Sequence, residues 1–562
     1  MHFVSRRRRQ VCRNLPVTAN RGTAGLDSAS AAPVVRFLFP MVKPSVLQPS
    51  TMEAEMNWKN LIDEVTAVGA GGGSEDTVAQ PVTGVEYDSR RVQPGSVFVA
   101  MKGGSTDGNR FVEKAIAAGA LGVITDSSQK FDHLLVFEVG LPVLEVEHGR
   151  RALAQASAAF FGHPERKLAA TGITGTNGKT TTAYLTEALL NAAARKTVLV
   201  GTIEYHVAGE VRPSVHTTPE SRDLYELMAE GVALGATELV TEVSSHALDQ
   251  GRAAGVKFDV AIFTNLTRDH LDYHQTMEKY FAAKQLLFDG TVYPAPRVAV
   301  INAHDPHSEQ LADAARKAGA EIRTYGIGQG DWRAASYTLT PSGAVLELET
   351  PAGKAKVTSR LAGEVNILNL LAAFTAAHAR GVSFADLVEF VPQLRPVPGR
   401  FQSVDAGQPF SVIVDYAHTD DALINLTALA RQMTAQTGGR VITMFGCGGD
   451  RDRTKRPKMG VAAGKGSDFV VATSDNPRSE EPLAILAEIE PGLKSAQVHY
   501  TIEPDRAAAI RLALREAKRG DVVLLAGKGH EKEQILSSGP IPFDDVEIAL
   551  SALGEMGYGG LE

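Results

Sequence analysis

The sequence predicts an α/β protein built from three consecutive domains. From residue 84 onward, short apolar segments rich in β-branched residues alternate with alanine-rich segments of helical length. This alternation is typical of parallel sheets covered by helices. The length of 562 residues also suits three or four domains of ordinary size.

The composition excludes several classes of protein. Hydrophobic residues make up 44% and charged residues 22% of the chain, which is ordinary for a soluble globular protein and unlike a collagen or a disordered chain. No segment approaches the roughly 18 consecutive apolar residues of a transmembrane helix, so we expect no membrane partner. Two cysteines, Cys12 and Cys447, are too few for a disulfide framework or a four-ligand zinc site, and they suit a reducing compartment.

Charge is distributed unevenly along the chain. The first 50 residues have a net charge of +7 and the remaining residues −15, which gives the total of −8. A body this acidic argues against a nucleic-acid partner, because such proteins need a basic face to neutralise phosphates. We therefore expect any phosphate group to bind locally, through loops and a metal ion.

Residues 1–56 form a predicted extension that precedes the folded domains. They are rich in Arg, Ser and Ala and show no period of a helix or strand. Three hypotheses fit them: a start codon assigned too early, with Met41, Met52 or Met56 as the true start; an organellar transit peptide; or a basic interaction arm. The transit peptide would place the protein in a plastid stroma, and the other two hypotheses leave it in the cytoplasm.

The predicted N-terminal domain covers residues 57–150 and the central domain 151–395. In the first, strands are expected at 96–100 and 122–125, with a helix at 111–119 between them. In the second, a strand at 168–174 leads through a glycine-rich loop into a helix at 181–193. Continuous apolar segments, typical of strands buried on both faces of a parallel sheet, follow at 197–200, 238–243, 260–265 and 298–302.

The predicted C-terminal domain covers residues 396–562. It follows a linker at 394–400, which contains two prolines and a glycine. Apolar segments beyond the linker predict a third α/β layer, with strands at 411–414, 441–445, 469–473 and 522–525.

The strongest local motif is the glycine-rich loop that begins at Gly175. Glycines allow main-chain N–H groups to turn towards phosphates, Lys179 would reach the outer phosphates, and the hydroxyl of Thr180 can hold Mg²⁺. The strict P-loop spacing is not met, because Ile173 stands five positions before Gly178. An ordinary strand–helix turn is the alternative, but a lysine and a threonine directly after the second glycine favour a nucleotide site.

Further candidates in the central domain are an acid, two histidines and a lysine. Glu242 ends a predicted strand, where a carboxylate can reach the metal ion of the loop. His270 and His274 are four residues apart, but residue 271 is leucine rather than the glutamate of a zinc-protease motif, so we expect a loop near Mg²⁺. Lys284 shares a helix face with aromatic residues; it either extends to the surface or is a functional, modified lysine.

Three motifs of the C-terminal domain each follow a predicted strand, which places them at one sheet edge. Arg451 and Arg478 could bind a carboxylate together, and Glu531 could hold an ammonium group. The three side chains describe a pocket for a zwitterionic amino acid.

These motifs together resemble the Mur ligases of peptidoglycan synthesis. The resemblance covers roughly residues 57–562 and rests on eight motifs in family order, namely TGTNGKTT, TEVSSHAL, NLTRDHLDYH, YFAAK, DYAHT, GCGGDRD, SDNPR and GKGHE. It implies a small UDP-binding α/β domain, a central P-loop ATPase domain with a mostly parallel sheet, and a Rossmann-like C-terminal domain.

The resemblance also implies the roles of individual residues. ATP would be bound by Gly175, Thr176, Asn177, Gly178, Lys179, Thr180, Thr181 and Asn366. The UDP-muramoyl-dipeptide would be bound by Ser89, Gly104, Ser105, Thr106, Thr217, Thr218, Ser244, Gln250 and Arg252. Diaminopimelate would be bound by Arg451, Asp475, Asn476, Pro477, Arg478, Gly527 and Glu531. Lys284 would be carboxylated by CO₂, and the metal ligands would be Thr180, Glu242, His270 and Lys284; the catalytic residues would be Lys179, Lys284, Glu242 and His270.

The implied activity is an ATP-dependent amide ligation that requires Mg²⁺. The resemblance implies addition of meso-diaminopimelate to the D-glutamate of UDP-N-acetylmuramoyl-L-alanyl-D-glutamate through an acyl phosphate, with Arg478 pairing the distal carboxylate that lysine lacks. We expect a cytoplasmic monomer with these small molecules as its partners. Two alternatives stay open: a related ligase for L-lysine, another amino acid or folate, and a nucleotide-binding plastid scaffold that has lost ligase activity.

The sequence departs from the family pattern at four places. They are His216 before the two threonines, Gln402 after Pro-Gly-Arg-Phe, Asp420 in place of a proline, and Lys532 to Gln534 after GKGHE. None of them falls on a predicted phosphate or amino-acid contact, so we expect them to affect fine specificity more than the class of reaction.

Overall fold

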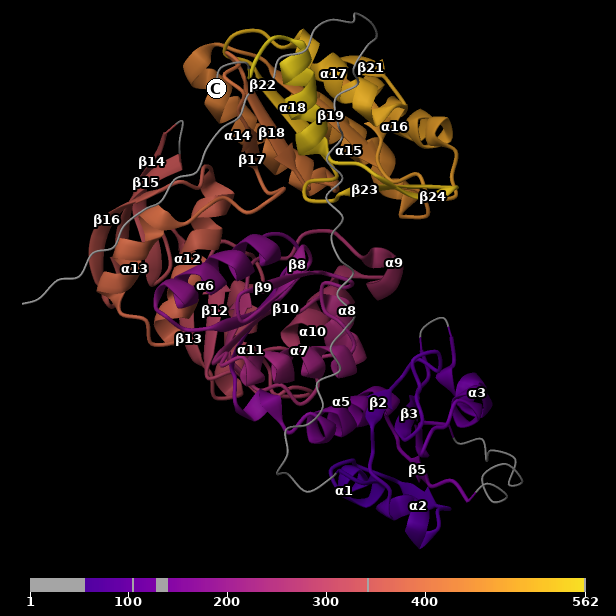
Figure 1. Cartoon of the computed structure of the whole chain (residues 1–562). Helices are drawn as coiled ribbons and strands as arrows, with labels where there is room; N and C mark the ends of the chain where they lie inside the picture. Colours follow the sequence, from indigo (N-terminus) through magenta and orange to yellow (C-terminus); the bar gives the residue numbers. More distant parts are fainter. Residues whose placement is uncertain (1–55, 104–105, 128–139, 341–342, 560–562) are drawn as a thin grey trace, which may run out of the picture. The chain divides into compact units, whose positions relative to one another are not determined.

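The computed structural model describes residues 56–103, 106–127, 140–340 and 343–559, and its elements can be followed from indigo to yellow in Figure 1. The predicted extension, Gly104 and Ser105 therefore lie outside the described residues, apart from Met56. Three large sheets span residues 69–145, 169–359 and 402–526, each inside one of the predicted domains. The domain boundaries themselves stay predictions.

The N-terminal sheet has five strands in the order β1-β5-β4-β3-β2. All neighbouring pairs are parallel except β1 with β5. Its elements are α1 (Trp58–Ile62), β1 (Gly69–Gly71), α2 (Glu75–Ala79), β2 (Gly84–Glu86), β3 (Ser96–Ala100), η1 (Gly108–Phe111), α3 (Val112–Ala117), β4 (Gly122–Thr125) and β5 (Val143–Glu145).

Helix α5 (Gly149–Phe160) belongs to two hydrophobic cores and crosses the predicted boundary at residue 150. Leu153 and Ala156 pack in the core of the N-terminal domain, whereas Ala154 and Ala158 pack in the core of the central domain. Alanines suit this position, since small side chains on both faces let the helix approach two sheets closely. The short helix η2 (Pro164–Arg166) then leads into the central sheet.

The central sheet has eleven strands in the order β16-β15-β14-β13-β12-β11-β6-β10-β7-β8-β9. The strands from β14 to β7 in this order are parallel to their neighbours, and the outer ones are antiparallel. The strands are β6 (Ala169–Thr174), β7 (Thr197–Val200), β8 (Glu204–Val207), β9 (Glu210–Pro213), β10 (Glu238–Glu242), β11 (Phe258–Phe263), β12 (Val298–Asn302), β13 (Glu321–Ile327), β14 (Trp332–Thr340), β15 (Gly343–Thr350) and β16 (Gly353–Ser359).

Helices cover both faces of this sheet, so that alternate residues of one strand enter different cores. In β11, Ala261 and Phe263 pack in one core and Val260 and Ile262 in the other. This is why residues 260–263 are all apolar. The helices are α6 (Lys179–Ala192), α7 (Ser221–Ala233), α8 (Ser245–Gln250), α9 (Leu271–His274), α10 (Met277–Gln285), α11 (Ser308–Lys317), α12 (Glu364–Ala379), α13 (Phe384–Phe390) and η3 (Val391–Gln393).

The C-terminal sheet has six strands in the order β17-β18-β22-β19-β20-β21, all parallel except β17. Its strands are β17 (Gln402–Val404), β18 (Ser411–Asp415), β19 (Val441–Cys447), β20 (Phe469–Ser474), β21 (His499–Ile502) and β22 (Val522–Ala526), and β23 (Glu533–Leu536) forms a hairpin with β24 (Gly539–Pro542). Its helices are α14 (Asp420–Thr437), η4 (Arg453–Lys455), α15 (Arg456–Gly466), α16 (Pro482–Ala496), α17 (Arg506–Glu516) and α18 (Asp545–Glu555).

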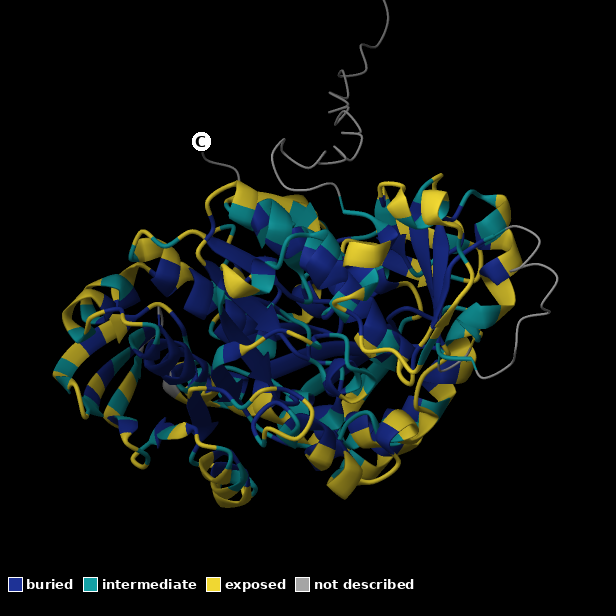
Figure 2. Cartoon of the chain, turned by 90° about the horizontal axis from the view of Figure 1, so that it is seen from below, coloured by how far each residue is buried: buried dark blue, intermediate teal, exposed yellow. Residues whose placement is uncertain are grey.

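The predicted strands are confirmed to within two residues at each end. The segment predicted at 260–265 ends earlier, at Phe263, because Asn265 leaves the strand direction and hydrogen-bonds the glycine-rich loop. The antiparallel strands at both ends of the central sheet were not predicted. Figure 2 shows the strands largely buried and the exposed residues mainly on helices and loops. None of the helices in the described ranges has the length and apolar character that a membrane crossing requires.

Candidate active site at two sheet edges

The glycine-rich loop links the carboxyl end of β6 to the start of α6. Gly175 and Gly178 have φ angles of +150° and +85°. A side-chain Cβ at Gly175 would lie 1.8 Å from Thr264 Oγ1, and one at Gly178 would lie 2.4 Å from Asn369 Oδ1. Both positions therefore require glycine for the loop to close.

Residues after β11 hold the loop in place. The main-chain N–H groups of Thr176 and Asn177 donate to the carbonyl and side-chain oxygens of Asn265, at 2.8 and 2.9 Å. Thr264 Oγ1 in turn donates to the carbonyl of Asn177 at 2.7 Å. The segment that begins at Asn265 thus supports the loop, a role that the sequence analysis did not assign to it.

Two lysines point at one carbonyl of this loop. Lys179 Nζ donates to the carbonyl oxygens of Gly175 and Thr176, both at 2.9 Å. Lys284 Nζ donates to the same Gly175 oxygen at 2.8 Å and lies 4.4 Å from the centre of the Tyr280 ring. The side chain of Lys284 is buried, so the hypothesis that it extends to the surface is wrong.

The electrostatics of these lysines disfavour a charged amine. Burial, together with the nearby charge of Lys179, holds the pKa of Lys284 well below its ordinary range. Burial also lowers the pKa of Lys179, although the carboxylates of Glu242 and Asp269 oppose the shift. In the part of the chain that the structure describes, neither lysine has a carboxylate within ion-pair distance. A bound anionic ligand would therefore stabilise the charged form of both amines.

Glu242 lies at the end of β10, next to the loop, and is fully buried. One of its oxygens accepts hydrogen bonds from Thr180 Oγ1 and Thr202 Oγ1, both at 3.1 Å, and the other accepts from the N–H of Thr202 at 2.8 Å. A hydroxyl and a carboxylate are the hard oxygen ligands that Mg²⁺ prefers beside bound phosphates. The pair therefore fits the ion that the sequence implies.

Of the four predicted metal ligands, His270 packs beside a second histidine. His270 precedes α9 with a φ of 53°, so it lies in a loop rather than on a helix face with His274. Its ring packs against His246, with 4.9 Å between the centroids. Among the described residues, no group of three His, Cys, Asp or Glu side chains lies close enough to hold a metal ion.

Most of the residues predicted to bind the UDP-muramoyl-dipeptide are connected by hydrogen bonds near the end of β10, where Glu242 lies. Thr218 Oγ1 donates to the carbonyl of Glu242 at 2.8 Å, and the N–H of Ser244 donates to Thr218 at 3.1 Å. Arg252 donates to the carbonyl of Thr218 at 3.0 Å and to the side chain of Gln250. The hydroxyl of Thr217 lies 3.1 Å from the hydroxyl of Thr202, which donates to Glu242.

Two further predicted binding residues, Ser89 and Asn366, lie in other parts of the chain. Ser89 is buried in the N-terminal domain, which contacts the central domain through the Arg91–Asp223 ion pair at 2.9 Å. Asn366 lies in the first turn of α12 and accepts a hydrogen bond from Asn369 at 3.4 Å. Asn369 in turn lies beside Gly178, so Asn366 is close to the glycine-rich loop. Ser89 is not brought to that loop.

The C-terminal motifs meet at the carboxyl ends of β19, β20 and β22. Arg478 Nη1 donates to the carbonyl of Gly449 at 2.9 Å and to that of Asn476 at 3.3 Å. Asn476 Nδ2 donates to Glu531 Oε2 at 2.8 Å. The predicted carboxylate-binding and ammonium-binding residues therefore flank one asparagine. Arg451 is exposed and donates to the carbonyl of Asp450 at 3.4 Å.

Two residues of the C-terminal domain reach the glycine-rich loop of the central domain. Arg400, from the predicted linker, donates to Thr180 Oγ1 at 3.3 Å and lies 4.5 Å from the centre of the Tyr416 ring. Asp421 accepts a hydrogen bond from Asn177 Nδ2 at 2.9 Å. Neither residue had a role predicted from the sequence, although Arg400 ends the Pro-Gly-Arg linker and Asp421 follows the DYAHT motif.

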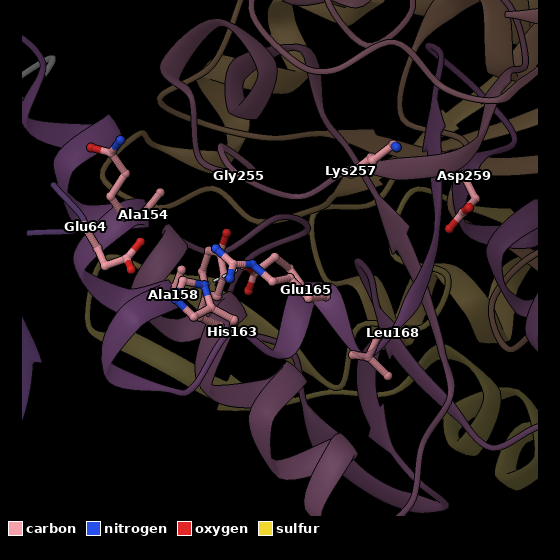
Figure 3. A pocket seen from close by; sticks show the side chains of 12 residues that line it. Glu64, Ala154, Ala158, His163, Glu165, Leu168, Gly255, Lys257 and Asp259 are labelled. Carbon is pink, nitrogen blue, oxygen red and sulfur yellow. Dashed lines mark hydrogen bonds and ion pairs between the residues drawn. The ribbon is translucent and has the colours of Figure 1, made fainter. Parts of the chain in front are cut away.

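A separate pocket of about 480 Å³ lies at the opposite edge of the central sheet (Figure 3). Its lining includes His163, Glu165 and Lys257, which stand near the amino ends of β6 and β11. Ligands of parallel sheets bind outside the carboxyl ends of the strands. None of the residues that the sequence predicted for the site lines this pocket, so we assign it no part in the candidate active site.

Family profiles match three consecutive parts of the chain. Their descriptions are "Mur ligase family, catalytic domain" for residues 81–161, "Mur ligase middle domain" for residues 173–377 and "Mur ligase, glutamate ligase domain" for residues 399–529.

Curated relatives carry one activity in their names. A UDP-N-acetylmuramoyl-L-alanyl-D-glutamate–2,6-diaminopimelate ligase of Solibacter usitatus is 49% identical over 85% of this chain and 94% of its own length. Ligases of the same name from Geobacillus thermodenitrificans and Synechococcus elongatus are 44% and 45% identical, over 86% and 84% of this chain and 96% and 94% of their own lengths.

Solved structures share the three-domain fold. A structure of a ligase with that same name has a TM-score of 0.63 at 32% identity and covers 90% of this chain and all of its own. A crystal structure of MurF from Acinetobacter baumannii has a TM-score of 0.59 at 20% identity, over 84% of this chain and 95% of its own.

Proposed function

The chain belongs to the Mur ligase family, and from this premise we propose that it is the ligase that joins meso-2,6-diaminopimelate to UDP-N-acetylmuramoyl-L-alanyl-D-glutamate. ATP is the co-substrate, and the product is a precursor of peptidoglycan. The names of relatives that are 44–49% identical and align over 94–96% of their own lengths support this activity.

The observation that carries the choice of amino acid is the arrangement around Asn476. Its carbonyl accepts from Arg478, and its side-chain amide donates to Glu531. A guanidinium and a carboxylate held on either side of one residue complement the carboxylate and the ammonium group of an amino-acid head group. Diaminopimelate presents such a head group at its distal end, whereas lysine presents an ammonium group alone.

The first step forms an acyl phosphate. The side-chain carboxylate of the D-glutamate attacks the γ-phosphorus of ATP, the bond from that phosphorus to the bridging oxygen breaks, and ADP leaves. Lys179 turns from the carbonyls of its own loop to the oxygens of the transferred phosphoryl group, where its charge stabilises the transition state. Arg400 lies beside the same loop and adds a second positive charge there.

Mg²⁺ would be held by Thr180 and Glu242, with His270 as a further candidate ligand. The bound ion supplies charge neutralisation for the phosphate oxygens. Lys284 would join this set as a carbamate, since burial favours the neutral amine that reacts with CO₂. A carbonyl ¹³C signal in protein exposed to ¹³CO₂, lost in Lys284→Met, would support this modification; the same signal in both proteins would contradict it.

The second step forms the amide bond. The amine nitrogen of diaminopimelate attacks the acyl carbon, the bond from that carbon to the phosphate oxygen breaks, and phosphate leaves as the nitrogen loses a proton. Arg478 and Glu531 hold the distal end of the amino acid meanwhile. The contacts of Arg400 with Thr180 and of Asp421 with Asn177 connect the amino-acid domain to the phosphate loop.

All the predicted substrate contacts lie on one chain between Ser89 and Glu531, so we propose that a monomer is active. We also propose the cytoplasm as its compartment, or a plastid stroma if residues 1–56 are a transit peptide. The intact mass of protein isolated from its source tests the last point, because a transit peptide would be absent from the mature chain.

The test is release of phosphate from ATP with the UDP-muramoyl-dipeptide, with meso-diaminopimelate or L-lysine supplied in parallel. We expect kcat/KM to favour diaminopimelate by about 10⁴-fold, since a site built to bind a polar group rejects a substrate that lacks it. Arg478→Ala should lose most of this preference, because its effect falls on diaminopimelate alone.

Arg453→Ala is the matched control. Arg453 lies in the same domain, is largely exposed and pairs with Glu488, so its loss should leave the preference unchanged. Turnover with lysine as fast as with diaminopimelate would overturn the specificity. No turnover with either amino acid, from protein that still binds ATP, would overturn the ligase activity and favour a scaffold.

A further inference from the structure

A buried lysine lies beneath the amino-acid pocket, and the family resemblance assigned it no role. Lys528 follows Gly527 in the GKGHE motif, and its side chain is fully buried. We propose that Lys528 is a positioning residue that orients Glu531 and Asn476 and keeps the pocket's two carboxylates ready for the ammonium group of the amino acid. This inference rests on the proposed function.

The hydrogen bonds of Lys528 fix its neighbours in one orientation. Its Nζ donates to Asn476 Oδ1 and to Glu531 Oε2, both at 2.9 Å. Asn476 Oδ1 also accepts the N–H of Ile535 at 3.0 Å. The amide nitrogen of Asn476 must then face Glu531, to which it donates at 2.8 Å. Without the ammonium group, Glu531 Oε2 would lose the donor of Lys528, and Asn476 Oδ1 would be held by the N–H of Ile535 alone.

The charge of Lys528 balances two carboxylates that would otherwise repel each other. Asp475 Oδ1 lies 4.0 Å from its Nζ, and Glu531 Oε2 lies 2.9 Å away. Two carboxylates in one pocket repel each other unless a cation lies near both. The ammonium group of Lys528 lies near both Asp475 and Glu531 and offsets this repulsion.

One of these carboxylates has an oxygen atom that accepts no hydrogen bond among the described residues. Asp475 is nine-tenths buried, and its Oδ1 has no hydrogen-bond partner among the described residues. The same aspartate lies beside Gly527, where an added Cβ would be 3.9 Å from its carboxyl carbon. A buried acceptor without a donor is costly, and an incoming ammonium group would supply the missing donor.

Another buried cation near the pocket, Arg506, has separate partners. Arg506 pairs with Asp545 at 2.6 Å and donates to the carbonyl oxygens of Ser474 and Ala526 at 3.2 and 3.1 Å. It therefore ties together the ends of β20 and β22 below the pocket. Lys528 is the residue whose ammonium group directly contacts the pocket's own side chains.

The test compares diaminopimelate with 2-aminopimelate, which keeps the distal carboxylate and lacks the distal ammonium group. In Lys528→Met we expect kcat/KM for diaminopimelate to fall at least tenfold, while kcat/KM for 2-aminopimelate changes less than threefold. The preference between these two substrates should therefore fall, with the KM for ATP unchanged. Lys528→Gln, which keeps a donor but no charge, should show the same direction and serves if the Met variant does not fold.

Lys532→Met is the matched control, because Lys532 lies four residues away, is largely exposed and pairs with Asp544 outside the pocket. It should keep the wild-type preference. Equal losses on both substrates in the Lys528 variants, or a raised KM for ATP, would overturn the positioning role and leave a purely structural one. A wild-type protein that uses neither substrate would instead overturn the proposed function.

Discussion

Buried lysine and arginine side chains lie beneath functional loops in both the central and the C-terminal sheet, but their hydrogen-bond partners differ. At the central edge, Lys179 and Lys284 donate to main-chain carbonyls of the glycine-rich loop. At the C-terminal edge, Lys528 and Arg506 are paired with the carboxylates of Glu531 and Asp545. Both edges follow parallel strands and both are glycine-rich, so the fold alone does not explain the difference.

The difference follows from the charge of the ligand that each edge would bind. A polyphosphate brings several negative charges, and lysines that lack a carboxylate partner leave the site able to accept them. An amino-acid head group brings one charge of each sign, so its pocket needs a cation and an anion that are both already in place. Ligand binding should therefore stabilise the central edge more than the C-terminal edge.

The largest expected effect is on catalysis at the central edge. Lys179→Met should lower kcat on the order of 10³-fold, the scale of a lost electrostatic contact to a transition state, while the thermal unfolding midpoint stays near that of the wild type. Stability is preserved because no carboxylate loses its partner. Phosphate release and calorimetry on the same samples provide the two measurements, and a large fall in the midpoint would mean that this lysine is structural.

At the C-terminal edge the corresponding change should act on stability. Arg506→Met leaves the fully buried carboxylate of Asp545 unpaired and should lower the free energy of unfolding by about 3 kcal/mol, or roughly 6–12 °C in the midpoint of that domain's transition. Adding Asp545→Leu should restore most of the loss. A double variant less stable than Arg506→Met would show that Asp545 stabilises the domain by some interaction besides its ion pair with Arg506.

A smaller effect, on the pH dependence of stability, concerns a charged residue of the central domain that lies away from the glycine-rich loop. It tests whether the lack of carboxylate partners is confined to the residues at that loop. His206 lies on β8 and contacts Glu187 at 2.7 Å and Glu204 at 3.0 Å. Burial lowers its pKa, but hydrogen bonds and the charges of these glutamates outweigh burial and raise the pKa to about 8. Away from the loop, a half-buried cation of the central domain thus has carboxylates on both ring nitrogens.

Because the pKa of His206 is higher in the folded chain than its ordinary 6.5, the stabilisation is complete below about pH 6.5 and is lost as the pH rises through 8. The shift corresponds to about 2 kcal/mol. Unfolding midpoints measured between pH 6 and 9 should fall more steeply for the wild type than for His206→Gln. Parallel curves would show that the ion pairs do not contribute.

The sequence predicted the elements whose pattern is local. Strands β3, β7 and β12 were predicted with their observed bounds, because a continuous β-branched segment between turn residues has few other structures available. The loop from Gly175 to Thr181 was predicted for a similar reason, since its two glycines and the lysine that follows the second are visible in the sequence. The outer antiparallel strands were missed because their alternation is weak and their partners lie elsewhere.

The sequence by itself determined the α/β class, the order of the motifs and the types of residue at each sheet edge. Only the tertiary structure decided that Lys284 is buried on the Gly175 carbonyl, that Arg400 reaches Thr180, and that Lys528 joins Asn476 to Glu531. The physical reason is distance along the chain. Periodicity and turn chemistry depend on neighbouring residues, whereas burial and pairing depend on segments that meet only when the sheets form.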